Sequence, residues 1–581
     1  MKSLFVSLLL LLVNNPVAAA DEPFFALLKS SGNITVKLYP TEVVKTGSSV
    51  LVSFGMPFTR GSITTAGLRT VRVLKSGTEI PAYVDQLTPW RHATKKSIDL
   101  KSVRVARIQF SHTFSAAYPA FESLTIEWGL HDRAKNVTTL RKPRSAWHLV
   151  SSGTFVAADL VYEPDVYVVL PTAALTQGVL RPGRMNPFSN SVASKRDSPT
   201  AMCNKWNWPG YQELEHAAKN NFYTIINEDD PHVTKENLCD YKNALSDTNG
   251  EPWLYDRSSA MFGLYFRSGF FRALREAVRS AEYYRNHLSR AGFFTLKDYD
   301  DPKYSYSECL AYLCWTTGDQ QSLAGTSAVV SAFKDVTARW NSSLNFWTER
   351  HAGFKLLANV VAYEVYGTSG YRDAVLSEAK DFIWHQNGAG GLIPANHVDG
   401  GLYHLGSQHD WDWDQDSYGA SPWMTVLLLD AMVRAFAVTE DPLIAKFIQR
   451  VGAFEKAAMN VTKNHLYEYG PYENQALAVP VYALLADGTF GATSWEDSEH
   501  ALDVASALAW ASYFANLLGS PDPTLRQAAV SYYKTYQIGV NYWIRPDSPV
   551  QYGKTAFRVS PWRKYGWEHR VSASFSWIIS P

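Results

Sequence analysis

The sequence carries no net charge, and this absence narrows the partners that the protein can have. Lys and Arg number 55 and Asp and Glu number 55, so the formal net charge is +0 at neutral pH. Proteins that bind nucleic acids or anionic membrane surfaces carry an excess of basic residues. We therefore expect no nucleic-acid partner and no polybasic membrane patch, and we expect affinity to come from a local site.

Sequence signatures of several enzyme classes are also missing. There is no G-x-S-x-G elbow, no Walker loop, no G-x-G-x-x-G after a strand and no H-E-x-x-H. The few cysteines are spaced unlike any zinc motif. We therefore expect no ATP, NAD or structural zinc, and no required cofactor.

Long apolar runs are confined to the amino terminus. Lys2 precedes the apolar run from Leu4 to Val13, and the small residues Ala18, Ala19 and Ala20 follow. These are the three parts of a secretory signal peptide, and we place the cleavage after Ala20. The run is too short to span a bilayer, which takes about 20 apolar residues, and no later run is long enough. The prediction is a secreted protein, extracellular or periplasmic, without a membrane span.

Only 4 cysteines are present. In an exported chain they favour disulfide bonds. Cys203 and Cys239 flank a loop-rich stretch and are candidates to pair. Cys309 and Cys314 would then either pair locally or remain buried.

Alternating apolar and polar residues, broken by Gly, Pro and Ser, mark the first part of the chain. The segments are ITVKLYP, SVLVSFGMPF, LRTVRVLKSGTEIPAYVDQL, VRVARIQFSHTF and SLTIEWGL. Such alternation is typical of strands with one buried face. We expect an antiparallel β-domain, a barrel or a sandwich, over residues 21–180. A linker rich in Pro, Arg, Ser and Asn follows over residues 181–203.

Paired helices repeat through the remainder of the chain. The first helix of each pair is apolar nearly all round, which indicates burial, and its partner is amphipathic. We expect an (α/α) toroid over residues 204–540, because nested hairpins bury their apolar faces on their neighbours. A tail with strand-like alternation occupies residues 541–581, so the fold class is multidomain α+β. The first helices lie in the segments 255–269, 306–319, 348–370, 421–441 and 498–520.

The order of these two domains resembles a known family. The segments SVLVSFGMPFTRGSI, LRTVRVLKSGTEIPAYVDQLTPW and VRVARIQFSHTF are similar to the RIFT-type barrel of exo-acting rhamnogalacturonan lyase-like proteins, in which a helical toroid follows. The resemblance extends over residues 31–540; those proteins are longer and carry further β-domains, so we expect the substrate to differ from theirs. It implies a secreted carbohydrate-active enzyme, a polysaccharide lyase, acting on an acidic polysaccharide. Aromatic residues make up 14% of the chain, and aromatic rings are the stacking platforms of carbohydrate clefts.

A lyase of this kind must neutralise a uronate carboxylate, remove the C5 proton and protonate the leaving oxygen. Arg, Asn or His suits the first task, and Tyr or His suits the other two. In a toroid the inner helices are parallel, so their N-termini converge, and converging N-termini attract anions. The predicted catalytic residues are His351, Tyr255, His409 and Tyr467. The predicted substrate-binding residues are Arg257, Arg350, Trp411, Trp413, Tyr418 and His500.

Alternating carboxylates in the loop before residue 421 suggest a weaker metal hypothesis. Asp410, Asp412 and Asp414 would share one face of an extended segment, and Ca²⁺ prefers oxygen ligands. The segment lacks the central Gly and closing Glu of an EF-hand. Solvated loop carboxylates are therefore the simpler interpretation.

Two other functions remain open at this point. A glycoside hydrolase of an acidic glycan would need two carboxyl groups, which Asp256, Glu349, Asp412 and Glu499 could supply. Asp and Glu at helix starts also serve as ordinary caps. A noncatalytic glycan-binding protein is the third alternative, which the polar residues at the helix starts disfavour.

Overall fold

The computed structural model describes most of the chain. The described residues are 24–150 except 27, 160–187, 253–409 except 298, 413–463, 473–492, 500–543 and 570–580. Several positions with predictions lie outside them: the signal peptide 1–20, most of the linker 181–203, Cys203, Cys239, Asp410, Trp411, Asp412, Tyr467 and Glu499.

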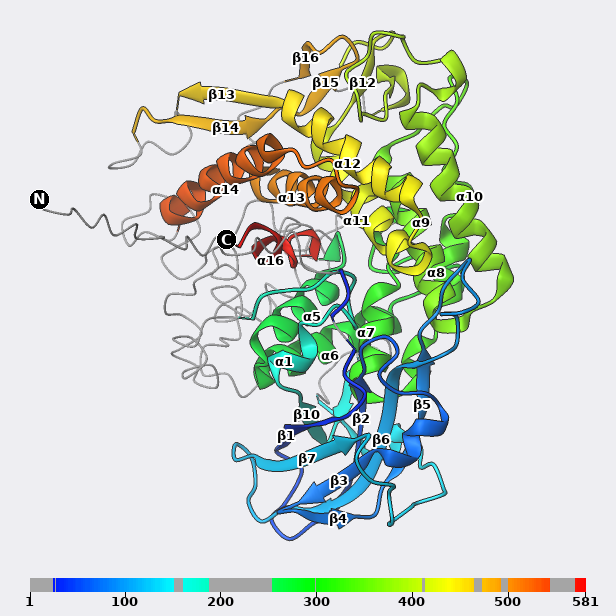
Figure 1. The fold of residues 1–581 in the computed structure, drawn as a ribbon, viewed down its shortest axis with the longest axis vertical. Helices are drawn as coiled ribbons and strands as arrows, with labels where there is room; N and C mark the ends of the chain where they lie inside the picture. The colour runs from blue at the N-terminus through cyan, green and yellow to red at the C-terminus, as the bar shows by residue number, and fades with distance from the viewer. Residues whose placement is uncertain are drawn as a thin grey trace, which may run out of the picture.

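An antiparallel β-domain forms the amino-terminal part, at the bottom of Figure 1. One sheet has the order β10-β1-β7-β3-β4, a second has the order β2-β6-β5, and β8 pairs with β9. Neither larger sheet closes on itself among the described strands. The strands are β1 (Gly32–Pro40), β2 (Ser49–Pro57), β3 (Arg72–Lys75), β4 (Thr78–Ile80), β5 (Tyr83–Pro89), β6 (Val103–Thr113), β7 (Glu122–Trp128), β8 (Trp147–Leu149), β9 (Tyr162–Pro164) and β10 (Val166–Val169).

The strands begin and end close to where the alternating segments predict them. β7 shows one buried face, because Leu124, Ile126 and Trp128 are buried while their neighbours are partly exposed. β6 lies between β2 and β5 and is buried on both faces over most of its length. The prediction of antiparallel sheets followed by helices is confirmed.

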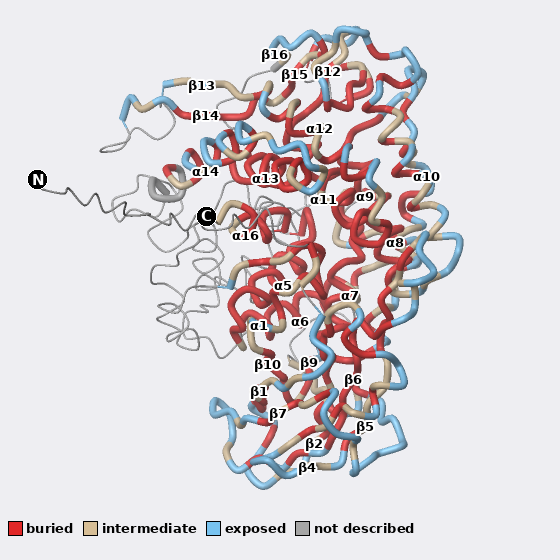
Figure 2. Tube along the Cα trace, in the orientation of Figure 1, coloured by how far each residue is buried: buried red, intermediate tan, exposed pale blue. Residues whose placement is uncertain are grey.

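Helices that are buried along nearly their whole length form the centre of the second part of the chain (Figure 2). Each packs against the next in the series. Because they are surrounded by other elements, their sequences are apolar on all sides. They are α5 (Arg257–Ser268), α7 (Glu308–Thr317), α9 (Glu349–Tyr366), α11 (Pro422–Thr439) and α13 (Ala501–Leu517).

A second set of helices alternates with the buried ones along the chain. α8 and α10 pack against α9, and α6, α12 and α14 pack against α5, α11 and α13. Most of them expose one face, as expected for amphipathic partners. They are α6 (Phe271–Asn286), α8 (Thr326–Ala332), α10 (Ser369–Gln386), α12 (Pro442–Ala457) and α14 (Pro523–Trp543); the short helix α1 (Thr172–Leu175) precedes the series.

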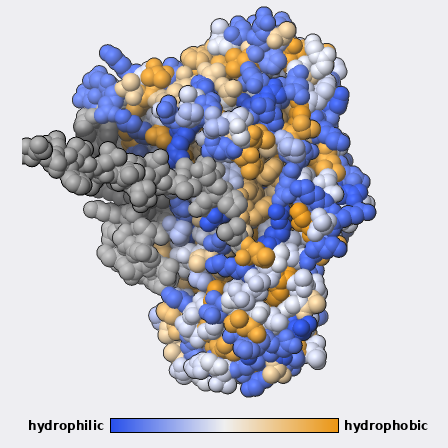
Figure 3. All heavy atoms as spheres, viewed as in Figure 1, coloured by the Kyte–Doolittle hydropathy of each residue, from blue (hydrophilic) through white to orange (hydrophobic). Residues whose placement is uncertain are grey.

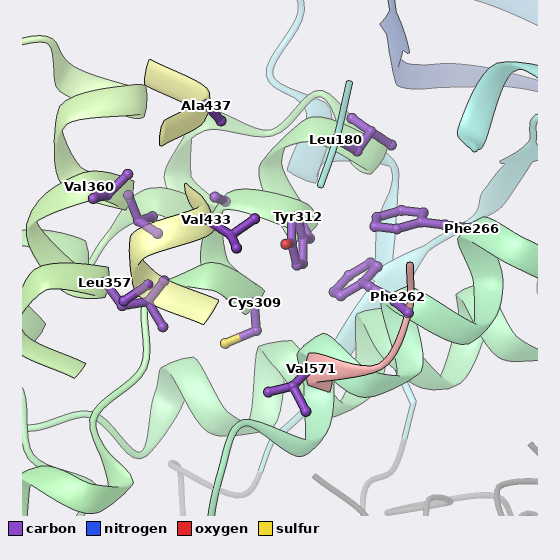
Figure 4. Close-up of a cluster of buried hydrophobic side chains, with 14 of the residues drawn as sticks. Leu180, Phe262, Phe266, Cys309, Tyr312, Leu357, Val360, Val433, Ala437 and Val571 are labelled. Atoms are coloured by element: carbon purple, nitrogen blue, oxygen red, sulfur yellow. The ribbon is translucent and has the colours of Figure 1, made fainter. Parts of the chain in front are cut away.

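The buried helices share one apolar core with the β-domain. Figure 4 shows side chains of α5, α7, α9 and α11 meeting Leu180 and Val571, which come from segments far apart in the sequence. The surface differs: the face in Figure 3 carries hydrophilic and hydrophobic residues side by side. By length and composition α11 alone among the described helices could cross a membrane, and all of it is buried within the protein.

Buried ion pairs join the two parts of the chain. Arg434 of α11 donates to Glu364 of α9 at 2.7 Å and also bonds Glu308 of α7. Arg104 of β6 donates to the second oxygen of Glu364 at 2.5 Å. Arg570 donates to Asp430 at 3.0 Å. We call these six residues the central ion network: Arg104, Glu308, Glu364, Asp430, Arg434 and Arg570.

A further buried carboxylate fastens the β8–β9 hairpin to α6. Glu163 accepts hydrogen bonds from Arg275 at 2.9 and 2.8 Å and from Arg279 at 3.0 and 2.9 Å. His148 of β8 lies between Glu163, at 3.3 Å, and Asp165, at 2.9 Å. Burial alone would lower the pKa of His148, but its hydrogen bonds to the two carboxylates raise it to about 9.

Parts of the predicted architecture are wrong or incomplete. The tail over residues 541–581 was predicted to be strand-like, but of its described parts residues 541–543 end the helix α14 and residues 570–580 contain the helix α16 (Phe575–Ile579). Phe575, Trp577 and Ile578 are all buried, and a short segment buried on several sides carries no reliable period. Within the helical region the sequence pattern missed strands: β11 (His404–Leu405), β12 (Tyr418–Ala420), β13 (Met459–Lys463), β14 (Ala476–Pro480), β15 (Ala483–Leu485) and β16 (Phe490–Ala492).

Two cysteines are described, and neither forms a disulfide bond. Cys309 and Cys314 are free thiols, buried on α7. Of the two alternatives left open by the sequence, burial without pairing is the one observed.

The charge on His148 makes stability depend on pH. Its pKa is higher in the folded protein than the ordinary value of about 6.5, so its contribution is complete below about pH 6.5 and is lost as pH rises through about 9. Because the side chain is partly solvated, we expect charged His148 to contribute about 1–2 kcal/mol to the free energy of unfolding. The measurement is urea unfolding of the wild type and His148→Gln at pH 6 and pH 9.5, each about half a unit outside that window.

His131→Gln is the matched control, because His131 is an exposed histidine of the same domain. We expect the stability difference between wild type and His148→Gln to shrink at the higher pH, and the His131→Gln difference to stay constant. An equal difference at both pH values for His148→Gln would contradict the assignment.

Close contact between α9 and α11 requires glycine at position 353. A Cβ added to Gly353 would lie 2.6 Å from the Cα of Leu428, a backbone atom that cannot move aside cheaply. We expect Gly353→Ala to lower the free energy of unfolding by about 1–3 kcal/mol. Gly263, in the middle of α5, has no atom within 4 Å of its added Cβ. Gly263→Ala should therefore raise stability by about 0.5–1 kcal/mol, and equal effects of the two variants in thermal or urea unfolding would refute the contact argument.

Candidate functional site

Side-chain contacts bring the starts of four buried helices together. Tyr255 precedes α5, and its hydroxyl oxygen accepts a hydrogen bond from Arg350 of α9 at 3.0 Å. The ring of Tyr255 meets Trp423 of α11 edge to face, with centroids 6.4 Å apart. Trp423 stacks on His500, the residue before α13, at 4.8 Å and 14°. We call Tyr255, Arg350, His351, Trp423 and His500 the helix-start cluster.

The turn before α5 holds Tyr255 in an uncommon backbone conformation. Tyr255 and Asp256 have φ values of 70° and 57°, in the left-handed region. For residues other than glycine this costs on the order of 1–3 kcal/mol each. Asp256 offsets part of it as the cap of α5, since its carboxylate accepts from the backbone N–H and the hydroxyl of Ser259 at 3.0 and 2.6 Å. This backbone conformation directs the Tyr255 hydroxyl toward α9.

The first turn of α9 supplies the cation and the histidine of the cluster. Thr348 caps the helix by accepting from the backbone N–H of His351, and its hydroxyl lies 2.7 Å from Nδ1 of the same residue. Burial, and then the charge of Arg350, lowers the pKa of His351 well below its usual value. His351 is therefore a neutral imidazole at neutral pH. The guanidinium of Arg350 also lies over the Trp423 ring, 5.6 Å from its centroid.

A second group of side chains adjoins the cluster. Glu349, the first residue of α9, His404 of β11 and His409 each offer one ligand atom, and these atoms lie within 4.8 Å of one another. Nε2 of His404 is 2.9 Å from Nδ1 of His409. One oxygen of Glu349 accepts from the backbone N–H of Ser421 at 3.1 Å. We call Glu349, His404 and His409 the Glu349 triad.

Burial controls the protonation of the triad. It raises the pKa of Glu349 to about 8, because nothing stabilises the ionised form as well as water would. It lowers the pKa of His404 to about 4 and, with the charges of His404 and Arg350, that of His409 to about 2. At neutral pH the triad thus holds a protonated carboxylic acid and two neutral imidazoles.

Aromatic rings fix the orientation of the two triad histidines. Trp413 lies 4.4 Å from the ring of His409, and Trp347 lies 5.1 Å from the ring of His404. Tyr482, on the segment between β14 and β15, faces both His409 and Trp423 at 6.4 Å. The triad and the helix-start cluster are therefore joined through a continuous aromatic layer.

The exposed fractions show which side of the combined site faces outward. Arg350, Trp423 and His500 retain 6–8% exposure, whereas Glu349 and His404 have none. A ligand would therefore meet the helix-start cluster first, with the triad behind it.

His500 is held by an acidic partner that the sequence analysis did not identify. Its Nδ1 donates to Asp503 at 2.9 Å, one turn further along the chain. A carboxylate in this position orients an imidazole and sets its tautomer. The H-x-x-D spacing at a helix start was the available signal. His404 was also missed, although its spacing from His409 was visible.

The structure brings some predicted site residues together and separates others. Tyr255, Arg350, His351, His409, Trp413 and His500 lie in the combined site. Arg257 instead lies with its guanidinium 5.5 Å from the Trp253 ring, and Tyr418 packs edge to face near Trp340 at 6.2 Å. Asp414 is exposed and accepts from Ser417 in its own loop. The calcium hypothesis, of which only Asp414 is described, stays a prediction.

Two acidic residues at helix starts have other partners, and one of them, Asp256, was considered for hydrolysis. Asp256 caps α5, and burial raises its pKa to about 6. Glu308, at the start of α7, belongs to the central ion network through Arg434. Of the described acidic residues proposed for hydrolysis, Glu349 is the one whose carboxyl group lies beside the triad histidines.

Comparisons with known proteins assign no family. No protein-family model matches the chain, and no curated protein matches its sequence. Among solved structures, the Lin0763 protein from Listeria innocua shows similarity with 10% sequence identity and a TM-score of 0.35, covering 59% of this chain and 88% of that one. Similarity of this degree assigns neither a family nor an activity.

Proposed function

We propose that the protein is a secreted polysaccharide lyase that cleaves a uronate-containing polysaccharide by β-elimination at the helix-start cluster. In this proposal the β-domain is a RIFT-type barrel and the paired helices form an (α/α) toroid. The order of the domains supports it, as does the series of buried helices whose starts meet at one place. The observation that carries it is the hydrogen bond between Arg350 and the Tyr255 hydroxyl beside neutral histidines.

Each step of an elimination has a candidate group in the cluster. Arg350 presents a planar guanidinium that can pair with the C6 carboxylate of a uronate and stabilise the charge that develops when C5 loses its proton. His351 or His409 is neutral and can accept that proton. The Tyr255 hydroxyl can protonate the departing O4. Trp423 and His500 stack on each other and keep 7–8% exposure, so their exposed edges are the part of the pair that a sugar ring can contact.

Hydrolysis remains the alternative, and one observation favours it. Glu349 is protonated at neutral pH, since burial raises its pKa to about 8, and a glycosidase requires a carboxylic acid of this kind to protonate the leaving oxygen. The two reactions differ in their products. Elimination leaves an unsaturated uronate that absorbs near 235 nm, whereas hydrolysis creates reducing ends without that absorbance.

We expect ultraviolet absorbance to grow when the purified protein is incubated with a panel of uronate polymers. Arg350→Met and Tyr255→Phe should each lower kcat/KM by about 100–1000-fold, because each removes a group that acts in the transition state. Arg372→Met and Tyr299→Phe are the matched controls, since both side chains are exposed, and they should retain the wild-type rate. Circular dichroism and urea unfolding would verify that all four variants are folded.

Reducing ends without absorbance would replace the lyase by a hydrolase, and Glu349→Gln would then be the variant to lose activity. Binding of a polymer without either product would establish a noncatalytic glycan-binding protein. Absorbance that survives in both Arg350→Met and Tyr255→Phe would leave a lyase but move its site away from the cluster.

A further inference from the structure

The Glu349 triad has the composition of a transition-metal site. Two imidazole nitrogens and one carboxylate oxygen are the protein ligands found in many zinc centres. Hard cations such as Ca²⁺ prefer oxygen ligands alone. The three residues come from two places in the fold, the start of α9 and the β11 segment, and their ligand atoms lie within 4.8 Å of one another. We propose that the Glu349 triad binds a divalent transition-metal ion of the zinc class.

The distance between the two imidazoles fits two ligands of one ion. Nε2 of His404 and Nδ1 of His409 are 2.9 Å apart. Two nitrogens bound to one tetrahedral zinc at about 2.0–2.1 Å would be separated by about 3.3 Å. A shift of a few tenths of an ångström, with the His409 proton moved from Nδ1 to Nε2, would therefore convert the contact between the rings into a pair of metal ligands.

The tautomer of His404 is set for coordination. Its Nδ1 lies 3.1 Å from the carbonyl oxygen of Leu402. A carbonyl oxygen only accepts, so Nδ1 of His404 carries the proton, and Nε2 of the neutral ring has the lone pair. A backbone carbonyl on the second nitrogen is the common way in which proteins orient a metal-binding histidine.

Glu349, once ionised, would supply the negative charge of the site. Its buried side chain is also a second, independent observation that points to a cation. Glu349 is fully buried, and its Oε2 has no hydrogen-bond partner among the described residues. Its other oxygen accepts from the Ser421 backbone, which fixes the side chain. A buried carboxylate oxygen with no donor is costly unless a cation approaches it. Loss of the Glu349 proton on binding would supply the ligand and release one proton to solvent.

A metal at the triad would also fix the neighbouring residues of α9. Glu349 precedes Arg350 and His351 directly, so coordination would anchor the first turn of α9 to the β11 segment. This role for the ion is positional, and metal binding itself does not depend on the proposed lyase activity.

The test measures metal binding without any polysaccharide. The full chain is stripped with a chelator and titrated with Zn²⁺ by calorimetry, and with Co²⁺ by visible absorption, which reports coordination geometry. We expect one tight equivalent in the wild type. His404→Gln, His409→Gln and Glu349→Gln should each weaken Zn²⁺ binding by at least about 100-fold.

His385→Gln is the matched control. His385 is a buried histidine beside the same Trp347 ring, 4.9 Å away, and its Nε2 contacts the Tyr403 carbonyl oxygen instead of the triad. This variant should bind Zn²⁺ as the wild type does. Equal affinity in His404→Gln and His385→Gln, or no uptake of Zn²⁺ and Co²⁺ by the wild type, would overturn the proposal.

If the triad variants fail to fold, X-ray absorption spectroscopy of the zinc-loaded wild type tests whether the triad binds the ion. Scattering from two imidazoles in a nitrogen and oxygen shell would support the site, and a shell with one imidazole or none would refute it. Lyase activity enters neither measurement, so the two proposals can fail separately.

Discussion

Arg434 lies fully buried on α11 and bonds carboxylates from two other helices at once, Glu308 and Glu364. Guanidinium and carboxylate groups are stable in an interior only when each finds partners there, because removing one partner leaves an uncompensated charge. Arg104 satisfies the second oxygen of Glu364 and thereby brings the β-domain into the same network. The relative positions of β6, α7, α9 and α11 are therefore set by one set of charges, and the positions of the helix starts follow from them.

The combined site has an unusual charge state for a buried polar region. The imidazoles of His351, His404 and His409 are neutral and Glu349 is protonated, since burial outweighs the local attractions, while the guanidinium of Arg350 keeps its charge. An anion that enters therefore meets the Arg350 cation in surroundings of low polarity, where the attraction is stronger than in water. A neutral imidazole is also the form of histidine that a base or a metal ligand requires. Lyase chemistry and metal coordination thus both require neutral imidazoles in the site.

Much of the fold could be predicted from the sequence because burial leaves a periodic signature. The segments 348–370 and 421–441 contain α9 and α11 nearly to the residue, since both helices are apolar all round. Placing polar residues at converging helix starts predicted Tyr255 and Arg350 as residues of one site, but not their hydrogen bond to each other. The contact of His404 with Glu349 was not predicted, because it depends on how the β11 segment folds back across α9. The central ion network could not be predicted either, because a charged residue is expected to be exposed unless its partner is known.

The central ion network also constrains the order in which the chain can fold. Arg104 and Glu364 are 260 residues apart, and Arg570 bonds Asp430 from 140 residues further along. During synthesis, Asp430 and Glu308 emerge before Arg570, so their contacts with Arg570 can form only after residue 570 has been made. Long-range contacts of this kind form late and slowly. Arg570 then acts as a closing element, because the ion network is complete only once residue 570 has joined the helical layers.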